Sequence, residues 1–379
     1  MTPSQTILFC PLDWGLGHAC RSVYYIHKLL EKGHRVIIAA DKTPLSFLRK
    51  EFPDLEWVRF PSYYRIRYSS ILPMFMLAPF YFLKIITGSV REHSFLKKLL
   101  KSHKPDIVIS DNRFGLWNKK KITIYITHQV CIRMPKWAKF LEKSVYKLHR
   151  WIIRKYDRCW IPDNQGPDNL SGELSGKFPL PLNASFTGIA SRFLLTENKS
   201  PEISNPYDIV VILSGPEPQR TILENKLFNI LHDSDKKIFL LRGKPGETEI
   251  PQHNYNIKMA NHLPSRNISV LLTQAGTIIC RSGYTMIMDL AALNKKALLI
   301  PTPGQTEQEY LAFYMNKCGR HISLSQKRLS ALWIKLEELK ALKPKSFKHS
   351  KNTDYTLRTL HSALLFIQPT SLHQQQQVQ

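Results

Sequence analysis

The sequence predicts an α/β protein with two Rossmann-like domains that face each other across a cleft. Two series of short apolar runs alternate with segments of helical periodicity, and continuous apolar runs are typical of parallel strands buried on both faces. A stretch rich in Pro, Gly, Ser and Asn separates the two series. The length of 379 residues also favours two domains, because one hydrophobic core seldom spans so long a chain.

The first series predicts a domain over residues 1–188. It opens with an apolar strand over 6–10, a loop containing glycines, a helix and a second strand over 36–40. The later strands that we expect lie at 56–60, 106–110, 123–127 and 158–161. Alternating strands and helices of this kind are typical of a parallel sheet.

The second series predicts a domain over residues 205–367, followed by a low-complexity tail over 368–379 that we expect to be disordered. Its expected strands lie at 208–213, 237–241, 276–280 and 297–300. Ligands of such folds bind at the carboxyl ends of the strands, so the cleft is the predicted site.

The charge balance favours anionic partners. Fifty-four Lys and Arg residues against 29 Asp and Glu residues give a formal charge of +25, which suits phosphate-bearing ligands, nucleic acid or anionic lipid. No RNA-binding or helix-turn-helix motif is recognisable, so nucleic acid is not the expected partner. The six cysteines form no C-x-x-C pair, which indicates a reduced compartment and predicts no metal site.

Two segments of the first half predict contact with a membrane surface. Residues 136–155 have helical periodicity, with apolar and aromatic residues beside one basic stripe. The stripe consists of Lys136, Lys139, Lys143, Lys147, Arg150 and Arg154. The apolar run over 71–83 is shorter than the ~20 residues of a spanning helix, and Pro73 and Pro79 interrupt it, so we expect a buried or membrane-dipping segment. Since no signal peptide is recognisable, we expect a cytoplasmic protein at the inner face of the membrane.

The loop after the first strand is a candidate for phosphate and acceptor binding. Gly15 and Gly17 let the backbone approach a phosphate at the start of the following helix. His18 begins that helix, and its imidazole is suited to act as a general base on an acceptor hydroxyl. The alternative is a histidine that only caps or hydrogen-bonds locally.

Polar residues at other strand ends of the first half are further candidates. Asp111 is expected to be a second acid–base group or to orient His18, and the alternative is an Asp that caps a turn. Asp13 is open to the same two interpretations. His128 follows another strand, at the rim where an acceptor should bind.

The second half carries the candidate donor site. Arg281, Ser282 and Gly283 follow a strand and precede a helix, where free N–H groups suit a diphosphate. Asp289 lies two turns farther on and is suited to accept hydrogen bonds from a ribose. Gln305, Gln308 and Glu309 follow the next strand and offer the fixed donors and acceptors that sugar hydroxyls need.

The stretch over 272–312, which contains RSGYTMIMDLAALNKKALLIPTPGQTEQEYLA, resembles the donor-binding half of family-28 glycosyltransferases, which have the GT-B fold. The loop ending at His18 resembles the same family's glycine loop. Together the two resemblances cover roughly residues 1–40 and 205–315. The family includes the enzymes that add N-acetylglucosamine to the peptidoglycan precursor, and the sequence resembles these as well.

The resemblance implies inverting, metal-independent transfer of a sugar to a hydroxyl, with a lipid-linked acceptor and a UDP-sugar as co-substrate instead of a cofactor. It implies that His18 is the base and that Asp289 takes the place of the family's ribose-binding glutamate. Gln308 and Glu309 fall on the family's paired glutamines, which hold the donor sugar. Glu in place of the second glutamine indicates a relative with another substrate.

The family's glycine-serine loop also departs from its pattern. Here it contains Ser214 and Gly215, followed by Pro216 and Pro218, and proline has no N–H to donate. We expect Arg220 to replace the missing donors as a phosphate ligand, because a guanidinium binds phosphate through two parallel hydrogen bonds.

Two other function classes stay open at this point. A nucleotide-sugar epimerase or hydrolase would use the same scaffold without an acceptor, because a fold does not fix a reaction. A basic nucleic-acid- or lipid-binding protein without catalysis would account for the charge alone.

Overall fold

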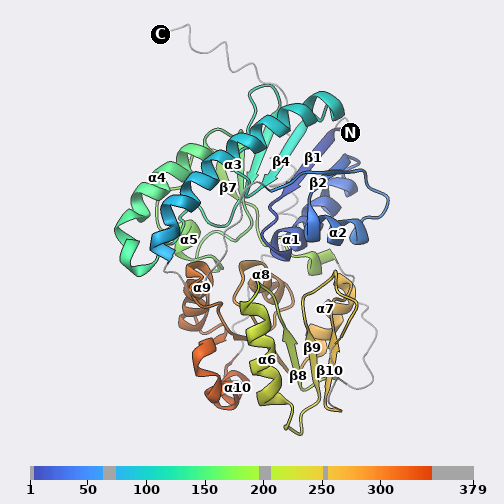
Figure 1. Cartoon of the computed structure of the whole chain (residues 1–379), viewed down its shortest axis with the longest axis vertical. Coiled ribbons are helices and arrows are strands. Elements are labelled where there is room, and N and C mark those ends of the chain that lie inside the picture. The colour runs from blue at the N-terminus through green and yellow to red at the C-terminus, as the bar shows by residue number, and fades with distance from the viewer. Residues whose placement is uncertain (1–3, 63–73, 196–205, 251–254, 344–379) are drawn as a thin grey trace.

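The computed structural model describes residues 4–62, 74–195, 206–250 and 255–343, and they form two α/β domains stacked one on the other (Figure 1). Helices α1 (Leu16–Glu31), α8 (Tyr284–Ala292) and α9 (Thr306–Lys317) lie where the two domains meet. The tail predicted over 368–379 lies outside the described residues, and the predicted domain limits stay predictions.

The first domain is built on a seven-stranded sheet with the order β3-β2-β1-β4-β5-β6-β7. Its strands are β1 (Thr6–Pro11), β2 (Arg35–Ala40), β3 (Trp57–Arg59), β4 (Ile107–Asp111), β5 (Ile122–Ile126), β6 (Arg158–Ile161) and β7 (Ala184–Phe186). All of their pairings are parallel, as the unbroken apolar runs predict.

The second domain is built on a six-stranded parallel sheet with the order β10-β9-β8-β11-β12-β13. Its strands are β8 (Ile209–Ile212), β9 (Ile238–Leu241), β10 (Ile257–Ala260), β11 (Thr277–Cys280), β12 (Leu298–Leu299) and β13 (Ile322–Ser323). The edge strands β10 and β13 were not predicted from the sequence. The first is interrupted by Lys258 and the second has only two residues, so neither gives a continuous apolar signal.

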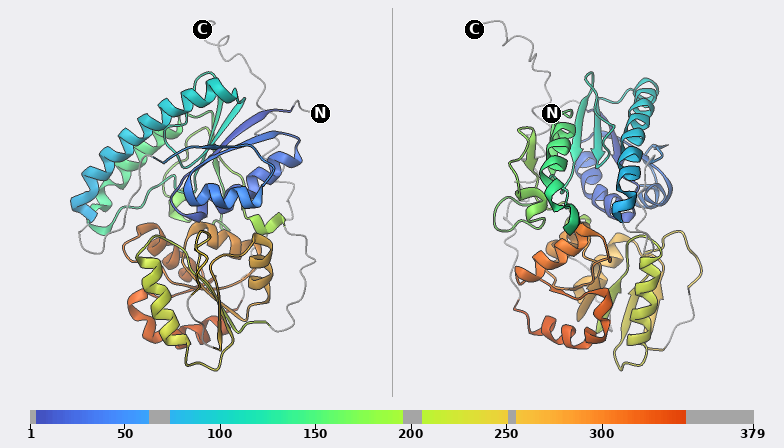
Figure 2. Two further views of the ribbon diagram at one scale, coloured as in Figure 1. Left: turned by 45° about the vertical axis from the view of Figure 1, so that its right-hand side comes forward. Right: turned by 60° about the vertical axis from the view of Figure 1, so that its left-hand side comes forward.

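Helices cover both faces of each sheet (Figure 2). In the first domain, α1 and α2 (Lys42–Glu51) pack on one face, and α3 (Met74–His103) and α4 (Glu142–Ile153) pack on the other. In the second, α7 (Ser265–Gln274), α8 and α9 oppose α6 (Gln219–Leu231) and α10 (Leu332–Ala341). The short elements are α5 (Glu173–Gly176), η1 (Lys136–Leu141), η2 (Arg192–Leu195) and η3 (Gln326–Ala331).

Each sheet has a point where the strand order reverses, and both points face the domain junction. In the first sheet this point lies between β1 and β4, with Pro11 opposite Asp111. In the second it lies between β8 and β11, with Ile212 opposite Cys280. Since α1 and α8 start just beyond these strand ends, their first turns meet across the junction. Ligands of parallel α/β sheets bind at such points.

The apolar run over 71–83 was predicted to be a buried or membrane-dipping segment interrupted by Pro73 and Pro79, and the structure corrects the interruption at Pro79. Helix α3 begins at Met74 and continues through Pro79, which costs it only a small part of the hydrogen bonds of a 30-residue helix. Of the side chains in this run, the structure describes only Phe82 and Leu83, which are 53% and 60% exposed, so the membrane-dipping alternative stays a prediction. Residues 71–73 lie outside the described residues.

None of the described helices combines the length and the apolar character needed to cross a membrane. The basic segment over 136–155 is divided between η1 and α4. Lys139, Lys143, Lys147 and Arg154 are exposed along it, and Arg150 is half-buried.

Candidate active site

The first half of the candidate site lies where β1 and β4 end. His18 is the third residue of α1, and Gly15, with φ of 95°, begins that helix in a conformation that favours glycine. The His18 Nδ1 atom lies 3.0 Å from Oδ1 of Asp111, the last residue of β4. The expected pairing of these two residues is therefore present, and the Nε2 side of the imidazole is not used by this contact.

Arg21 completes this group and was not predicted from the sequence. It lies one turn after His18, and its Nε donates to Asp111 Oδ2 at 2.8 Å while its Nη2 contacts Asp111 Oδ1 and lies 2.8 Å from His18 Nδ1. The spacing of three residues on one helix could have indicated it, because such residues share a face.

The electrostatics of this group follow from burial and pairing. Burial by itself would raise the pKa of Asp111, but the Arg21 guanidinium and His18 hold it well below its usual range. Asp111 is therefore an anion at neutral pH and does not serve as an acid. Its contacts fit the role of orienting His18 better than that of a second acid–base group.

A second polar chain leads from Arg21 into the other domain. Arg21 Nη1 lies 3.0 Å from His128 Nδ1, and His128 Nε2 lies 2.9 Å from Oε1 of Glu307, the second residue of α9. The His128 ring also stacks on the ring of Tyr284 with centroids 4.1 Å apart. His128, predicted to lie at the acceptor rim, is thus largely buried between the domains.

The second half of the site lies where β8, β11 and β12 end, and its loops leave room beside their glycines. A Cβ atom added at Gly283 or Gly304 would meet nothing within 4 Å, and one at Gly215 would meet only Thr302 Oγ1 at 3.6 Å. Gly283 precedes the first turn of α8, whose N–H groups have no intrahelical partner. Open backbone at a helix start is what a diphosphate requires.

Arg281 lies beneath these loops and has an unusual set of contacts. Its guanidinium donates to the carbonyl oxygens of Gln219, Ile300 and Pro301 and to Gln326 Oε1 at 2.7–3.2 Å, and so ties three strand-end loops together. Burial lowers the pKa of Arg281 to about 10, which leaves it charged at neutral pH. Among the described residues the other five buried arginines each have a carboxylate partner, whereas Arg281 has none.

The residues predicted to hold the donor sugar do different things in the structure. Gln308 is buried, and its Oε1 accepts from Thr302 N at 2.9 Å, while its carbonyl accepts from Ser282 Oγ at 2.8 Å. Glu309 is exposed and accepts from Gly304 N at 2.9 Å. The side-chain oxygen of Gln305 is buried without a hydrogen-bond partner.

Glu309 lines a groove of about 490 Å³ beside the donor loops. The groove runs between α9 and the segment after β13, and Phe313, Asn316 and Lys327 line it as well. This groove is open space next to the predicted sugar position.

Two predicted donor ligands are engaged elsewhere. Asp289 is 3% exposed, and its Oδ1 accepts from Ser191 Oγ at 2.5 Å beneath η2, so a ribose cannot reach it in this arrangement. Arg220 is also buried, and it pairs with Glu217 at 2.6 Å and with Glu224. Sequence spacing placed both residues near the ligand but could not show the carboxylate and hydroxyl groups that occupy them. Arg220 is an ion-pair partner in this arrangement, and its role as a phosphate ligand stays a prediction.

The glycine loop of the first domain makes one of the contacts that join the two halves. The carbonyl oxygen of Gly17 accepts from Thr285 Oγ1 at 3.1 Å, and a Cβ atom at Gly17 would lie 3.3 Å from that oxygen. Thr285 is two residues beyond Gly283, and Gly17 immediately precedes His18. Gly17 thus allows the two domains to approach closely, and Asp13 is buried beside the same loop.

Within the described residues no group of three or more His, Cys, Asp or Glu side chains is placed to hold a metal ion.

The second domain matches the model of a known protein family. Residues 214–363 match the glycosyltransferase family 28 C-terminal domain. No curated protein matches the chain.

Among solved structures, CalG4, the calicheamicin glycosyltransferase, is similar with a TM-score of 0.64 and 14% identity, over 98% of this chain and 100% of that one. MurG of Acinetobacter baumannii has a TM-score of 0.54 and 14% identity, over 95% and 100%. A proposed UDP-N-acetylglucosamine 2-epimerase from Listeria monocytogenes has a TM-score of 0.58 and 12% identity, over 96% of each chain.

The two domains therefore have the GT-B fold of glycosyltransferases. The match over residues 214–363 shows that the second domain is similar to the C-terminal domain of family 28, and together with the fold it supports a glycosyltransferase. The fold and the family resemblance predicted from the sequence are both confirmed.

We expect Asp111→Asn to lower the free energy of unfolding by about 3–5 kcal/mol at pH 7, because it leaves the Arg21 guanidinium buried without its carboxylate. The pKa of Asp111 is lower in the folded protein than the ordinary 3.8, so its ionised form stabilises the fold above that pH, and this stabilisation is lost as the pH falls below it. Urea denaturation over a pH series measures both effects.

The difference between wild type and variant should therefore shrink from pH 7 towards pH 3. Asp235→Asn is the matched control, since that carboxylate is 84% exposed, and it should leave the stability unchanged. A difference that stays constant with pH would contradict the role of the ionised Asp111.

Proposed function

We propose that the protein transfers a sugar from a nucleoside diphosphate donor, a UDP-sugar in the first instance, to a hydroxyl group of an acceptor. The observation that carries this proposal is the contact between Gly17 and Thr285, which brings the start of α1 against the start of α8. His18 follows Gly17, and Gly283 lies two residues before Thr285, so this contact brings the two segments together. A base and a diphosphate cradle on opposite sides of one junction are what glycosyl transfer needs.

The chemistry proposed for the site is inverting and needs no metal. His18 takes the proton of the acceptor hydroxyl through Nε2 while Asp111 orients the ring from the Nδ1 side. The hydroxyl oxygen attacks the anomeric carbon as the bond to the diphosphate breaks. The N–H groups of α8 and the unpaired charge of Arg281 then stabilise the departing diphosphate.

The donor sugar is proposed to extend from Gly283 towards the groove lined by Glu309 and Phe313. A carboxylate and an exposed aromatic ring suit the hydroxyls and the apolar face of a sugar ring. Ribose binding by Asp289 stays a prediction that requires Ser191 to release the carboxylate.

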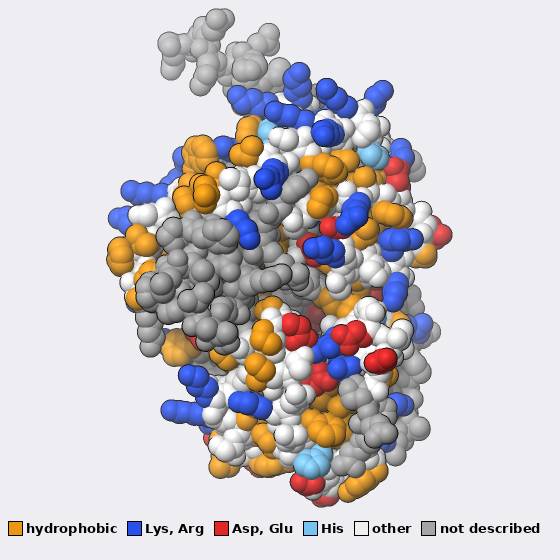
Figure 3. All heavy atoms as spheres, viewed as in Figure 1, with side chains coloured by type: hydrophobic (Ala, Val, Ile, Leu, Met, Phe, Trp, Pro, Cys, Tyr) orange, Lys and Arg blue, Asp and Glu red, His pale blue; other side chains and the backbone are white. Residues whose placement is uncertain are grey.

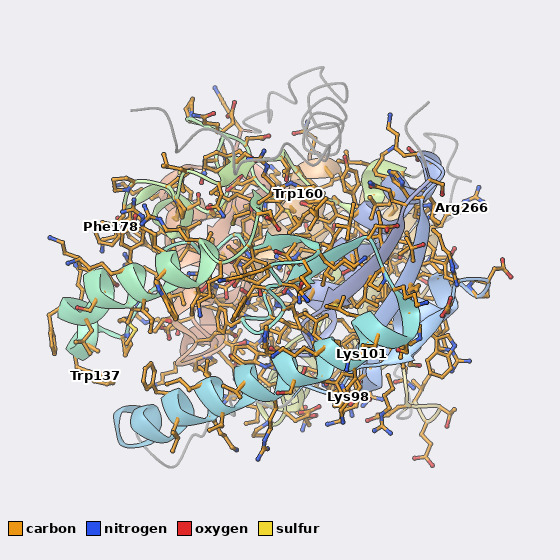
Figure 4. All side chains as sticks on the ribbon, turned by 90° about the horizontal axis from the view of Figure 1, so that it is seen from above. Lys98, Lys101, Trp137, Trp160, Phe178 and Arg266 are labelled. Carbon is orange, nitrogen blue, oxygen red and sulfur yellow. The ribbon has the colours of Figure 1, made fainter. Side chains whose placement is uncertain are left out.

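A lipid-linked acceptor and a membrane surface are proposed from the outer face of the first domain. Hydrophobic and basic side chains gather there over α3 and α4 (Figure 3), and Trp137 projects from η1 away from the sheets (Figure 4). Phe140 and Trp151 are 78% and 56% exposed beside the lysines of the stripe. Exposed aromatic residues among lysines suit an anionic bilayer surface, here the cytoplasmic leaflet.

An epimerase or hydrolase is the second candidate, and the similarity to the proposed 2-epimerase is the observation that favours it. The two candidates differ in what they consume. An epimerase or hydrolase changes the nucleotide sugar without an acceptor, whereas the transferase releases the nucleoside diphosphate only when an acceptor hydroxyl is present. Product analysis with and without an acceptor extract distinguishes them.

We expect Gly283→Val to weaken binding of UDP and UDP-sugars at least about tenfold while the protein stays folded. A side chain at this position enters open space in the free protein and meets only a bound phosphate. Thermal unfolding with a panel of nucleotides measures it, since ligand at a hundred times its Kd should add about 2.7 kcal/mol to the wild type. Gly176→Val, also in open space but in the first domain, is the matched control. Equal stabilisation of both variants would remove Gly283 from the donor site.

We expect His18→Ala to lower kcat by about 10²–10⁴ with little change in donor affinity, because a general base acts on the acceptor proton and not on donor binding. The measurement is the initial rate of transfer with the donor and acceptor found in the screen, together with donor affinity by calorimetry. Transfer at the wild-type rate would exclude His18 as the base.

We expect Phe140→Ser combined with Trp151→Ser to reduce binding to vesicles of anionic phosphatidylglycerol at least about tenfold, because two exposed apolar side chains no longer enter the interface. Cosedimentation at low and high salt measures the effect. Ile334→Ser, which removes a 65% exposed side chain from α10 of the second domain, is the control. An equal loss in the control, or none in the double variant, would argue against this docking face.

A further inference from the structure

Three segments of the first domain meet around the side chain of Lys155, just after the end of α4. Its Nζ atom lies 3.6 Å from the ring centroid of Trp151 on α4 and 4.7 Å from that of Trp117, in the segment between β4 and β5. The ring of His93 on α3 stacks on Trp117 with centroids 4.3 Å apart. We call Lys155, Trp117 and Trp151 the Lys155 cage.

The cage holds a positive charge that no carboxylate of the described residues neutralises. Burial lowers the pKa of Lys155 below its ordinary 10.5, and no nearby anion opposes this shift. Indole faces attract an ammonium group, but the three N–H donors of that group form their best hydrogen bonds with oxygen acceptors. A half-buried ammonium in these surroundings is therefore more stable when an anion is bound.

His93 adds support to the cage without adding charge. Its Nδ1 atom lies 3.1 Å from the carbonyl oxygen of Gly115, which can only accept, so Nδ1 carries the proton. Burial lowers the pKa of His93, and the charges of Lys97 and Lys155 act in the same direction. The imidazole is thus neutral at pH 7, and Lys155 is the cation of this cluster.

The exposure of Trp151 determines which kind of anion fits the cage. Its ring is 56% exposed on the face where Phe140 is exposed as well. Tryptophan favours the headgroup level of a bilayer, because its ring is apolar and its N–H group is polar. Since the ammonium lies 3.6 Å from the same ring, a bilayer that receives Trp151 brings its phosphate groups to the level of Lys155. A free phosphate ion would leave the exposed ring in water.

We propose that the Lys155 cage binds the phosphate group of an anionic phospholipid when the first domain lies on the membrane. The inference rests on the docking face proposed above and adds one defined headgroup site to it. Lys155 donates hydrogen bonds to the phosphate oxygens, and Trp151 contacts the apolar part of the same lipid. The half-buried Trp117 supports the ammonium from its other side chain contact.

This site should differ from the basic stripe in its response to salt. Exposed lysines such as Lys143 and Lys147 attract an anionic surface at a distance. At about 1 M salt the Debye length is about 3 Å, so this attraction is screened, whereas a half-buried ammonium in contact with a phosphate is screened less. Binding that survives high salt is therefore expected to depend on Lys155 as well as on the exposed aromatic rings.

The first test measures cosedimentation with phosphatidylglycerol vesicles at about 1 M salt. Lys155→Gln should reduce binding at least about fivefold, since a lysine beside an anionic surface contributes about 1 kcal/mol. Lys155→Arg should stay within about twofold of wild type, because a guanidinium also stacks on indoles and binds phosphate. Lys147→Gln is the matched control, since it removes an equal charge from an exposed site on α4, and it should change binding by less than about twofold. Thermal unfolding of each variant verifies that the fold is retained.

The second test uses the wild-type protein and reports on Lys155 itself. Acetic anhydride acetylates accessible lysine amines, and mass spectrometry measures the rate at each lysine. Phosphatidylglycerol vesicles at about 1 M salt should protect Lys155 from acetylation. Phosphatidylcholine vesicles, whose choline group compensates the phosphate, and inorganic phosphate should not protect it.

The outcomes separate this site from the docking face. If Lys155→Gln binds phosphatidylglycerol at high salt as the wild type does, the headgroup site is overturned and the docking face stands. Equal protection by phosphatidylcholine overturns the selection for anionic lipid, and equal protection by inorganic phosphate makes the ligand a soluble phosphate instead. If the wild type binds no vesicles, the docking face is overturned and this site with it. None of these results bears on sugar transfer, because His18 and the donor loops take no part in them.

Discussion

The buried ion pair between Arg21 and Asp111 is the interaction on which the site depends. Both side chains are at most 1% exposed, and removing two charges from water is so costly that only good geometry and further hydrogen bonds can offset it. The structure provides them, since Arg21 reaches both oxygens of Asp111 as well as His128. The pair ties α1 to the end of β4 and thereby fixes His18 at the point where the strand order of the first sheet reverses.

Glycines perform two opposite tasks around this centre. Gly17 and Gly172 allow the two domains to approach closely, and a Cβ atom at Gly172 would lie only 2.3 Å from the hydroxyl of Tyr310 on α9. Gly283 and Gly304 instead leave space beside the strand ends of the second sheet. The domains are thus in contact through α8 and α9 while the backbone of the donor loops stays accessible. Glycine serves both purposes because it has no side chain: the domains can approach closely at some glycines, and space for a ligand is left at others.

How much the sequence could predict differs between the fold and the site. The inner strands were predicted because burial on both faces leaves continuous apolar runs, as in β2 and β4. The pairing of His18 with Asp111 was predictable as well, since both follow strands that are neighbours in a Rossmann-like order. The position of Gly283 was predictable too, because a glycine between a strand end and a helix start lies where parallel α/β sheets bind their ligands.

The partners of the charged side chains could not be predicted. Whether Asp289 meets a ribose or Ser191, and whether Arg220 meets a phosphate or Glu224, depends on contacts between segments far apart in sequence or on the rotation of one helix turn. Arg21 and Glu307 were missed for the same reason. Each is an ordinary charged residue on a helix, and only the packing of the two domains places both against His128.

The protein has positive charge of two kinds: exposed lysines at the surface and the buried Arg281 at the donor loops. Inside the protein, positive charge is neutralised locally, as Arg113 is by Glu92 and Arg242 by Glu224. Among the described residues, the positive charge without a carboxylate partner lies mainly at the surface, where lysines such as Lys143 and Lys147 stand beside exposed aromatic rings. Arg281 is the exception among the buried arginines of the described ranges, because its charge meets only carbonyl and amide oxygens. A buried cation without a carboxylate, next to open N–H groups, is most stable when an anion is bound, and a nucleoside diphosphate supplies one at that point.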